Sequence, residues 1–385
     1  MAGADLPGGK LSEDLGLVFV TIRKYFIFYI RLLQNNPERW FTKVRILAFS
    51  AERIGHTAPA SSQSPTHFER KSTKGAAMKS LKCFLSVAAI FMIVFVSQVQ
   101  AQELRIGTAS QGGAFYPVGQ AIATLINKYA DGLTAVPVVT QGSVQNPRLV
   151  NSGEIDIGIT NNNLALFANE QKGPYAKGNK MDLAAVGSLH FSILHMITLA
   201  DSSINTFEDI KGKRVAVGPA GGGTMGFLNR LLPVYGMTMD DIKPSFLGYS
   251  DGFSQLADGN VDAAFALSGY PAGAVTQARV TKELKHIQFT DEKLAELLEK
   301  YPFYSKVDVS KDVYRTPEDG TVLGVNNMLV ANSSMDEETV YKITKAIYDH
   351  MDEFMQINAY AKQIVPENSK NLTIPLHAGS ARYFK

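Results

Sequence analysis

The amino-acid sequence predicts an α/β protein of two lobes that are joined by a double crossover. Three observations support this fold class. The chain has 385 residues, which is enough for two domains with their own hydrophobic cores. From residue 104 onward, short apolar stretches of strand length alternate with amphipathic stretches of helix length. After residue 200 the alternation starts again, so two α/β units follow each other along the chain.

In the first unit, strands and helices follow each other closely. Pro117 falls in the first turn of one predicted helix and Pro147 near the start of the next, where proline is tolerated because the first helical amides have no intrahelical partner. The predicted strands are 104–108, 135–140, 156–160, 184–189 and 193–200, and the predicted helices are 116–129 and 146–152. This order is typical of a largely parallel sheet.

The second unit repeats that order. It opens with a short helix within 203–211, with Thr206 as the expected N-cap and acidic residues in the first turn. Further strands are predicted at 214–218, 244–247, 263–267, 284–289 and 321–331, and further helices at 224–235, 253–258, 271–280, 293–301 and 336–356, the last capped by Ser333 or Ser334. We expect the extended segments 193–200 and 321–331 to connect the units, which gives lobe 1 (102–196), lobe 2 (197–322) and a return to lobe 1 (323–385).

Residues 78–101 have the three parts of a secretory signal peptide. A short basic segment begins at Met78, and an apolar run of 14 residues, CFLSVAAIFMIVFV, follows it. This run is too short to span a bilayer comfortably, and small residues up to Ala101 suit cleavage. Since a signal peptide should begin a chain, we interpret residues 1–77 as a non-native extension from upstream read-through. The alternative is a genuine membrane-anchoring extension.

The charge distribution argues against nucleic-acid binding. Of the 38 Lys and Arg residues, 13 precede residue 102, together with 6 of the 36 Asp and Glu residues. The remainder carries 25 basic and 30 acidic residues, and such a body lacks the positive surface that nucleic acids require. The only cysteine, Cys83, also precedes residue 102, so the body needs no disulfide and tolerates an oxidising compartment. We therefore expect a secreted protein.

One motif resembles the catalytic elbow of serine hydrolases. The segment GYSDG at 248–252 matches G-x-S-x-G and lies between a predicted strand and a predicted helix. Such an enzyme needs a downstream acid and a histidine. His286, His350 and His377 follow, but none has a recognisable catalytic context. A hydrolase that uses Ser250 stays open as an alternative to a ligand-contacting turn.

A glycine-rich segment, GGGTMG at 221–226, matches G-x-G-x-x-G between a strand and a helix. No clear ribose-binding acid ends the next strand, and the segment lacks the lysine of a P-loop, so we expect no nucleotide cofactor. Glycines still allow close backbone approach, and the free N–H groups at a helix start hold anions. His190 and His195 have no metal-ligand spacing, so we expect packing rather than a metal site.

Small polar or glycine-rich loops follow several predicted strands. They are 110–116, 141–143, 161–163, 221–224 and 250–251. Open α/β sheets bind ligands beyond the carboxyl ends of their strands. The pattern therefore predicts a ligand cleft between the lobes, and the alternative is that these loops are ordinary turns.

Several ordered blocks carry a more specific pattern. They are IGTASQGGAFYPVG (106–119), QGSVQNPRL (141–149), SGEIDIG (152–158), DIKGKRVAVG (209–218) with GGGT (221–224), DAAFALSGYP (262–271) and PLH (375–377). Together they resemble the TAXI family of TRAP-transporter solute-binding proteins. The sequence departs from the family pattern at Ala109, where glycine is usual, at Phe115, where tyrosine is usual, and at 161–163 and 190–191.

The resemblance implies a periplasmic binding protein-like II fold, with two lobes around a central ligand cleft. It implies a receptor, without catalysis, cofactor or metal, that delivers a small organic anion such as glutamate or a related dicarboxylate or keto acid to TRAP-type membrane permease subunits, which we expect to be fused. A receptor for a sensor kinase would use the same pocket. The implied ligand-binding residues are Ser110, Gly113, Ala114, Phe115, Tyr116, Ser143, Asn162, Gly222, Gly223, Thr224 and Ser250.

Overall fold

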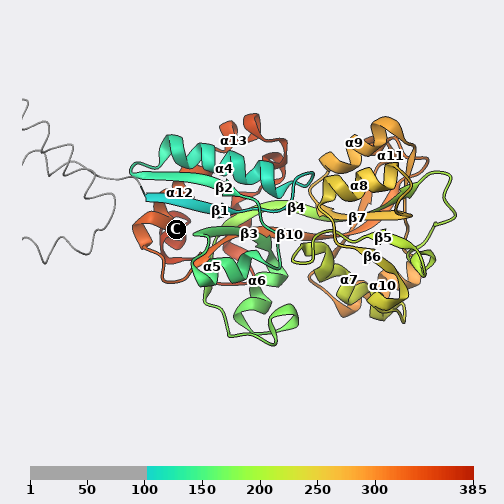
Figure 1. The fold of residues 1–385 in the computed structure, drawn as a ribbon. Coiled ribbons are helices and arrows are strands. Elements are labelled where there is room, and N and C mark those ends of the chain that lie inside the picture. The colour runs from blue at the N-terminus through green and yellow to red at the C-terminus, as the bar shows by residue number, and fades with distance from the viewer. Residues whose placement is uncertain (1–101) are drawn as a thin grey trace, which may run out of the picture. The chain divides into compact units, whose positions relative to one another are not determined.

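The computed structural model describes residues 102–385, which form one mixed sheet with helices on both faces (Figure 1). The strand order is β2-β1-β3-β10-β4-β7-β5-β6, while β8 pairs with β4 and β9 with β10. The strands are β1 (Gln102–Gly107), β2 (Leu133–Val138), β3 (Ile157–Asn161), β4 (Leu183–Leu199), β5 (Arg214–Ala216), β6 (Lys243–Ser245), β7 (Ala263–Ser268), β8 (Leu284–His286), β9 (Ser305–Val309) and β10 (Gly320–Asn332). The predicted segments 1–77 and 78–101 lie outside the described residues.

Two long strands, β4 and β10, connect the two halves of the sheet. They run antiparallel, from Gly324 opposite Ile193 to Asn332 opposite Leu183. β3 pairs with β10 and β7 pairs with β4, so elements from both halves attach to this central pair. The predicted lobe boundaries, 196/197 and 322/323, fall within these two strands.

The sheet is less parallel than the sequence predicts. β1 pairs in parallel with β2 and β3, and β5 pairs in parallel with β6 and β7. Strands β4, β8, β9 and β10 run antiparallel to their partners, so the prediction of a largely parallel sheet is wrong for the middle of the sheet; β9 was not among the predicted strands. The physical reason is the double crossover: the chain leaves lobe 1 along β4 and must return along β10 in the opposite direction.

Helices cover both faces of each half of the sheet (Figure 1). In lobe 1, α4 and α12 pack on one face and α5 and α6 on the other; in lobe 2, α8 and α9 oppose α7 and α10. The helices are α4 (Phe115–Tyr129), α5 (Asn146–Ser152), α6 (Asn162–Asn169), α7 (Gly223–Val234), α8 (Tyr249–Ala257), α9 (Gly273–Thr281), α10 (Asp291–Lys300), α11 (Lys311–Tyr314), α12 (Glu337–Tyr348), α13 (Met351–Ile357) and α14 (Ala378–Tyr383). Short 3-10 turns include η2 (Gly173–Tyr175) and η5 (Ala359–Gln363). No helix among residues 102–385 combines the length and the apolar character needed to cross a membrane.

Alternate residues of the inner strands feed separate cores. Val215 and Phe265 pack with α7 and α10, whereas Ala216 and Ala264 pack with α8 and α9. Because side chains of a strand point to opposite faces in turn, a strand covered on both faces must be apolar at every position. This explains the unbroken apolar runs of the sequence.

Several predicted elements have different bounds. Segments 184–189 and 193–200 form a single strand, β4. The predicted helix 336–356 is two helices, α12 and α13, and its cap is Asp336, whose carboxylate accepts from the Thr339 amide, rather than Ser333 or Ser334. Helix α8 begins at Tyr249, so Ser250 lies in its first turn and not in a loop. Helix α6 was not predicted, because three consecutive asparagines at its start favour a turn.

Four histidines of the described chain are buried, and three of them, His190, His195 and His286, pack against aromatic rings. His190 packs edge-on against Phe115, with ring centroids 5.6 Å apart, and His195 and His286 flank Tyr314 at 5.6 and 6.1 Å. Burial lowers the pKa of His190 and His195 to about 3 and that of His286 to about 4; the nearby His286 lowers the pKa of His195 further. No group of three or more potential metal-ligating side chains occurs within residues 102–385.

These histidines predict that acid destabilises the fold. In the unfolded chain they bind protons near pH 6.5, whereas in the folded chain they stay neutral down to about pH 3–4. Below pH 6.5 the unfolded state therefore binds more protons, and the free energy of unfolding should fall as pH falls, by on the order of 1 kcal/mol per pH unit for each histidine. Urea denaturation of the full chain at about pH 7.5, 6 and 5 measures this slope.

The variant His286→Leu removes one of the three titrating groups. It should reduce the dependence of stability on pH below 6.5 by roughly one third. An equally steep dependence in this variant would contradict the assignment of the effect to buried histidines.

Candidate functional site

The loops at the carboxyl ends of the strands meet between the lobes and contact one another directly. The Ala114 amide donates to Ser268 Oγ at 2.9 Å, and the Ala274 amide donates to the Gly112 carbonyl at 3.0 Å. On the other face of the sheet, the amides of Val144 and Gln145 both donate to the carbonyl of Gly221, at 3.0 and 3.1 Å. Each bond joins lobe 1 to lobe 2, so the two lobes are closed on each other.

A set of buried neutral polar side chains lies at this junction, and we call it the interlobe layer. Its members come from β3, β4, β7, β10, the starts of α7 and α8, and the loop before α5: Ser143, Asn161, Ser192, Thr224, Tyr249, Ser268 and Asn327. All are at most 5% exposed. A Cβ at Gly223 would lie 2.9 Å from Asn161 Oδ1 and 3.0 Å from Ser143 Oγ, which places the start of α7 directly over the lobe 1 members. The layer contains no charged side chain.

Asn327 holds the floor of this layer. Its Nδ2 donates to Ser192 Oγ at 2.8 Å and to the His190 carbonyl at 2.7 Å, and its Oδ1 accepts from Asn161 Nδ2 at 2.7 Å. The register between β10 and β4 shifts at Asn327, between the paired positions Asn326 and Met328. Such an irregularity disturbs the backbone ladder, and here the His190 carbonyl bonds to the Asn327 side chain.

The helices that begin at the junction lack side-chain caps. The N-cap positions of α4, α6, α7, α8 and α9 make no capping hydrogen bond from a side chain. By contrast, α10, α11, α12 and α14 are each capped by a side chain; α13, which follows α12 at once, is not. The first amides of a helix have no intrahelical acceptor. At the junction the amides of Ala274 and Tyr249 already donate to the opposite lobe, and the other first-turn amides of these helices have no side-chain cap.

Acidic residues follow the same division. The first turns of α4, α5, α6, α7 and α9 carry no Asp or Glu, and only α8 has one, Asp251. The helices α10, α11, α12 and α13 each have at least one. Acidic side chains near a helix start offset the positive end of its dipole. The helix ends at the junction therefore keep most of their positive potential, which suits a negatively charged ligand.

The structure brings several of the predicted site residues to the junction. Ser143 and Thr224 belong to the interlobe layer, and Thr224 Oγ1 lies 3.0 Å from the hydroxyl of Tyr249. Gly222 and Gly223 form the start of α7. Gly113 and Ala114 face lobe 2, since a Cβ at Gly113 would lie 3.0 Å from the Tyr249 ring.

Other predicted site residues lie outside the interlobe layer, although Ser110 and Ser250 still lie where the lobes meet, since a Cβ at Gly112 would lie 2.5 Å from Ser250 Oγ. Phe115 is buried against His190. Ser110 Oγ accepts a long hydrogen bond of 3.5 Å from the Tyr249 amide. Ser250 lines a groove between α8 and α9. Tyr116 and Asn162 make no side-chain hydrogen bond to the interlobe layer within the described part of the chain.

The predicted set omits five members of the layer. Ser268 and Asn161 end strands β7 and β3, so the pattern of polar residues after strands could have indicated them. Tyr249 begins α8, next to the predicted Ser250. Ser192 and Asn327 lie within buried strands that also hold other polar residues, such as His190 and Asn326, so no local signal distinguishes them.

A comparison with known protein families shows to which family the chain belongs. The sequence pattern of the NMT1-like family matches residues 106–385. The chain belongs to the NMT1-like family. The matched residues span both lobes of this NMT1-like protein. They include β4, β10 and every member of the interlobe layer.

Solved structures of transport proteins are similar to it in fold. The periplasmic aliphatic sulphonate binding protein SsuA from Escherichia coli is 19% identical, with a TM-score of 0.38 over 69% of this chain and 80% of that chain. The putative L-cystine ABC transporter from Listeria monocytogenes is 16% identical, with a TM-score of 0.42 over 70% and 99%. A binding protein component of an ABC phosphonate transporter from Pseudomonas aeruginosa is 11% identical, with a TM-score of 0.42 over 69% and 80%. The predicted α/β architecture, in which a double crossover joins two halves of the sheet, is confirmed by the strand order and by the long strands β4 and β10.

The contacts at Gly221 predict a variant that opposes closure. A Cβ at Gly221 would lie 2.6 Å from Gln141 Oε1, 2.8 Å from Gln141 Cβ and 3.2 Å from Gln145 Cβ. These atoms belong to the opposite lobe, so Gly221→Ala should push the lobes apart without disturbing either core. Hydrogen–deuterium exchange of the full chain should show faster exchange at the amides of Val144 and Gln145, which donate to Gly221.

Gly178→Ala is the matched control, because the nearest atom to its added Cβ is the Tyr175 carbonyl oxygen at 3.6 Å. Its exchange pattern at Val144 and Gln145 should equal that of the wild type. Unchanged exchange in Gly221→Ala would show that these contacts do not hold the lobes together.

Proposed function

We propose that this protein is an extracytoplasmic solute receptor that encloses a small organic anion between its lobes. The observation that carries the proposal is the convergence of uncapped helix starts on a buried, neutral polar layer. Uncapped N–H groups and hydroxyl groups hold a carboxylate through charge-assisted hydrogen bonds and need no arginine. A layer without a charged side chain favours an anion over a cation, since only N–H, O–H and amide groups compensate the ligand's charge.

The lobe contacts support a clamshell mechanism. The solute would first meet the donors of one lobe, such as Ser143 and the start of α4. Strands β4 and β10 would flex, and the start of α7 would then close over it. A solute favours the closed state only to the extent that it binds this state more tightly than the open state. Donors from both lobes, such as Ser143 and Thr224, supply that difference.

The sequence blocks support the finer assignment. We propose a TAXI-type receptor that delivers glutamate or a related dicarboxylate or keto acid to TRAP-type permease subunits. The blocks GGGT and QGS lie where α7 and α5 begin, against the interlobe layer. A signal peptide that starts near Met78 would direct the receptor to the periplasm. A sensor-kinase receptor would share this pocket, and the neighbouring genes distinguish the two.

The geometry argues against hydrolysis by Ser250. Within residues 102–385 no hydrogen bond joins Ser250 to a histidine. The three downstream histidines have other partners: His286 packs on Tyr314, His350 stacks on Tyr129 and His377 caps α14. A serine nucleophile needs an adjacent base, and none of the three serves.

The anion-binding role of Thr224 can be tested directly. In the full chain, glutamate, 2-oxoglutarate and succinate are titrated by calorimetry. A compound that binds should also raise the free energy of unfolding, by about 2.7 kcal/mol at a hundredfold excess over its Kd. Thr224→Ala should weaken its binding by about 1–3 kcal/mol, because a donor to a charged group is lost.

Thr344→Ala is the matched control for this test. Thr344 is as fully buried as Thr224, but its hydroxyl bonds to Val340 and Ser380 in lobe 1. It should lower stability and leave the Kd unchanged. Equal affinity in wild type and Thr224→Ala would remove Thr224 from the site, and no binding of any organic acid would count against the receptor.

Ser250→Ala separates the receptor from the hydrolase. A receptor should show no ester hydrolysis in either protein, and solute affinity should fall by at most about 0.5–3 kcal/mol, the range for one lost hydrogen bond. The exposed Ser254 lines the same groove, so Ser254→Ala is the control. Wild-type esterase activity that disappears only in Ser250→Ala would establish the enzyme instead.

A further inference from the structure

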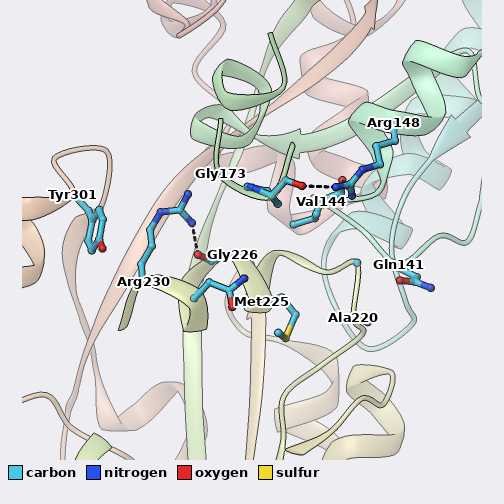
Figure 2. A pocket seen from close by; sticks show the side chains of 12 residues that line it. Gln141, Val144, Arg148, Gly173, Ala220, Met225, Gly226, Arg230 and Tyr301 are labelled. Carbon is cyan, nitrogen blue, oxygen red and sulfur yellow. Dashed lines mark hydrogen bonds between the residues drawn. The ribbon is translucent and has the colours of Figure 1, made fainter. Parts of the chain in front are cut away.

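A hollow lies between the lobes, lined by residues of both (Figure 2). Its volume is about 700 Å³, and Gln141, Arg148 and Pro174 line it from lobe 1 while Met225 and Arg230 line it from lobe 2. No member of the interlobe layer lines it. Volumes of about 300–1,000 Å³ are typical of small-molecule sites, so the hollow is large enough for a ligand of its own.

Two arginines, one from each lobe, flank the same short turn in this hollow. Arg148, on α5, donates through Nη2 to the Pro174 carbonyl at 2.6 Å. Arg230, on α7, donates to the Gly226 carbonyl, and its Nη2 lies 3.5 Å from where a Cβ of Gly173 would stand. Since Gly173 and Pro174 are neighbours in η2, both guanidinium groups lie close to one turn (Figure 2).

Neither arginine has an acidic partner within residues 102–385. Other arginines of the described chain do have one: Arg105 pairs with Asp156, and Arg214 pairs with Asp262. The hollow therefore keeps two uncompensated positive charges, and its walls supply no carboxylate. Paired charges of one sign in a concave site attract ligands of the opposite sign.

Aromatic rings hold both guanidinium groups in place. The guanidinium carbon of Arg148 lies 4.8 Å from the centre of the Tyr175 ring. That of Arg230 lies 4.9 Å from the Phe167 ring and 5.5 Å from the Phe303 ring. Stacking uses the face of a guanidinium and neither neutralises its charge nor occupies the N–H groups at its edge. A guanidinium has five N–H donors, so both arginines keep donors for an incoming acid group.

We propose that this hollow is a separate binding site for an organic di-acid with an apolar body. One acid group pairs with Arg148 and the other with Arg230. The body lies against the apolar wall that Val144, Pro174, Met225 and Tyr301 provide. Because the two arginines belong to different lobes, a bound di-acid bridges the lobes and favours the closed state. The di-acid and the proposed solute should then increase each other's affinity.

Calorimetric titration of the full chain with terephthalate, suberate and glutarate tests this site, with benzoate as the mono-acid comparison. At least one di-acid should bind saturably and more tightly than benzoate. Arg148→Gln and Arg230→Gln should each weaken it by tenfold or more, the usual effect of losing a hydrogen bond to a charged group. Arg→Lys at either position should weaken it less, because the charge stays while the planar fork is lost.

Two controls separate this site from the interlobe layer. Arg315→Gln removes one positive charge from an exposed residue outside the hollow and should leave di-acid binding unchanged. Thr224→Ala should also leave di-acid binding largely unchanged, while it weakens binding of the solute. Thermal unfolding checks that each Gln variant is folded. Di-acid binding that survives both Gln variants, or no saturable binding of terephthalate, suberate and glutarate, would overturn this site. The proposed receptor is judged separately, by its binding of glutamate, 2-oxoglutarate or succinate and by the Thr224→Ala variant.

Discussion

The side-chain amide of Asn327 joins three strands at the point where the lobes meet, and the rest of the structure depends on this junction. It bonds to Asn161 on β3 and to His190 and Ser192 on β4, while its own strand, β10, runs between them. A buried amide that satisfies both its donor and acceptor groups fixes the relative position of the strands it joins. The loops that approach from either lobe therefore start from one rigid floor, and lobe motion must be absorbed farther along β4 and β10.

The distribution of helix caps shows which helices lack the stabilisation that a side-chain cap provides. A side-chain cap contributes about 1 kcal/mol to a helix, and the chain supplies one at Thr290, at Asp336 and at Ser310, away from the junction. At the junction it places Ala114, Gly222 and Gly248 in the cap position instead. Functional sites often keep such unsatisfied groups at the expense of local stability. The missing caps are thus the feature of the fold that the proposed anion binding accounts for most directly.

How much the sequence predicts depends on the range of the interactions involved. Strand positions and the glycine-rich loop before α7 follow from local rules of burial and backbone freedom, so pattern analysis finds them. The antiparallel run of β4 and β10 and the role of Asn327 depend on partners more than a hundred residues away, which no local pattern encodes. The arginine hollow is similar: Arg148 reads as a surface residue of a short helix until the fold places η2 and α7 beside it.

The single carbonyl of Gly221 accepts two amides from the other lobe, and this geometry sets an energetic scale for opening. Each such bond is replaced by bonds to water when the lobes separate, so it contributes only about 0.5–1.5 kcal/mol. Other bonds between the lobes, such as those from the Tyr360 hydroxyl to the Pro271 carbonyl and from Gln363 to the Tyr270 carbonyl, are exchanged for water in the same way. Where such exchange leaves the open and closed forms within a few kcal/mol of each other, both forms are populated. A membrane partner that recognised only the shape of the closed form would also respond when the lobes close briefly without a solute. Discrimination must therefore rest on how long the closed form lasts, and a bound solute lengthens that lifetime by slowing the opening step.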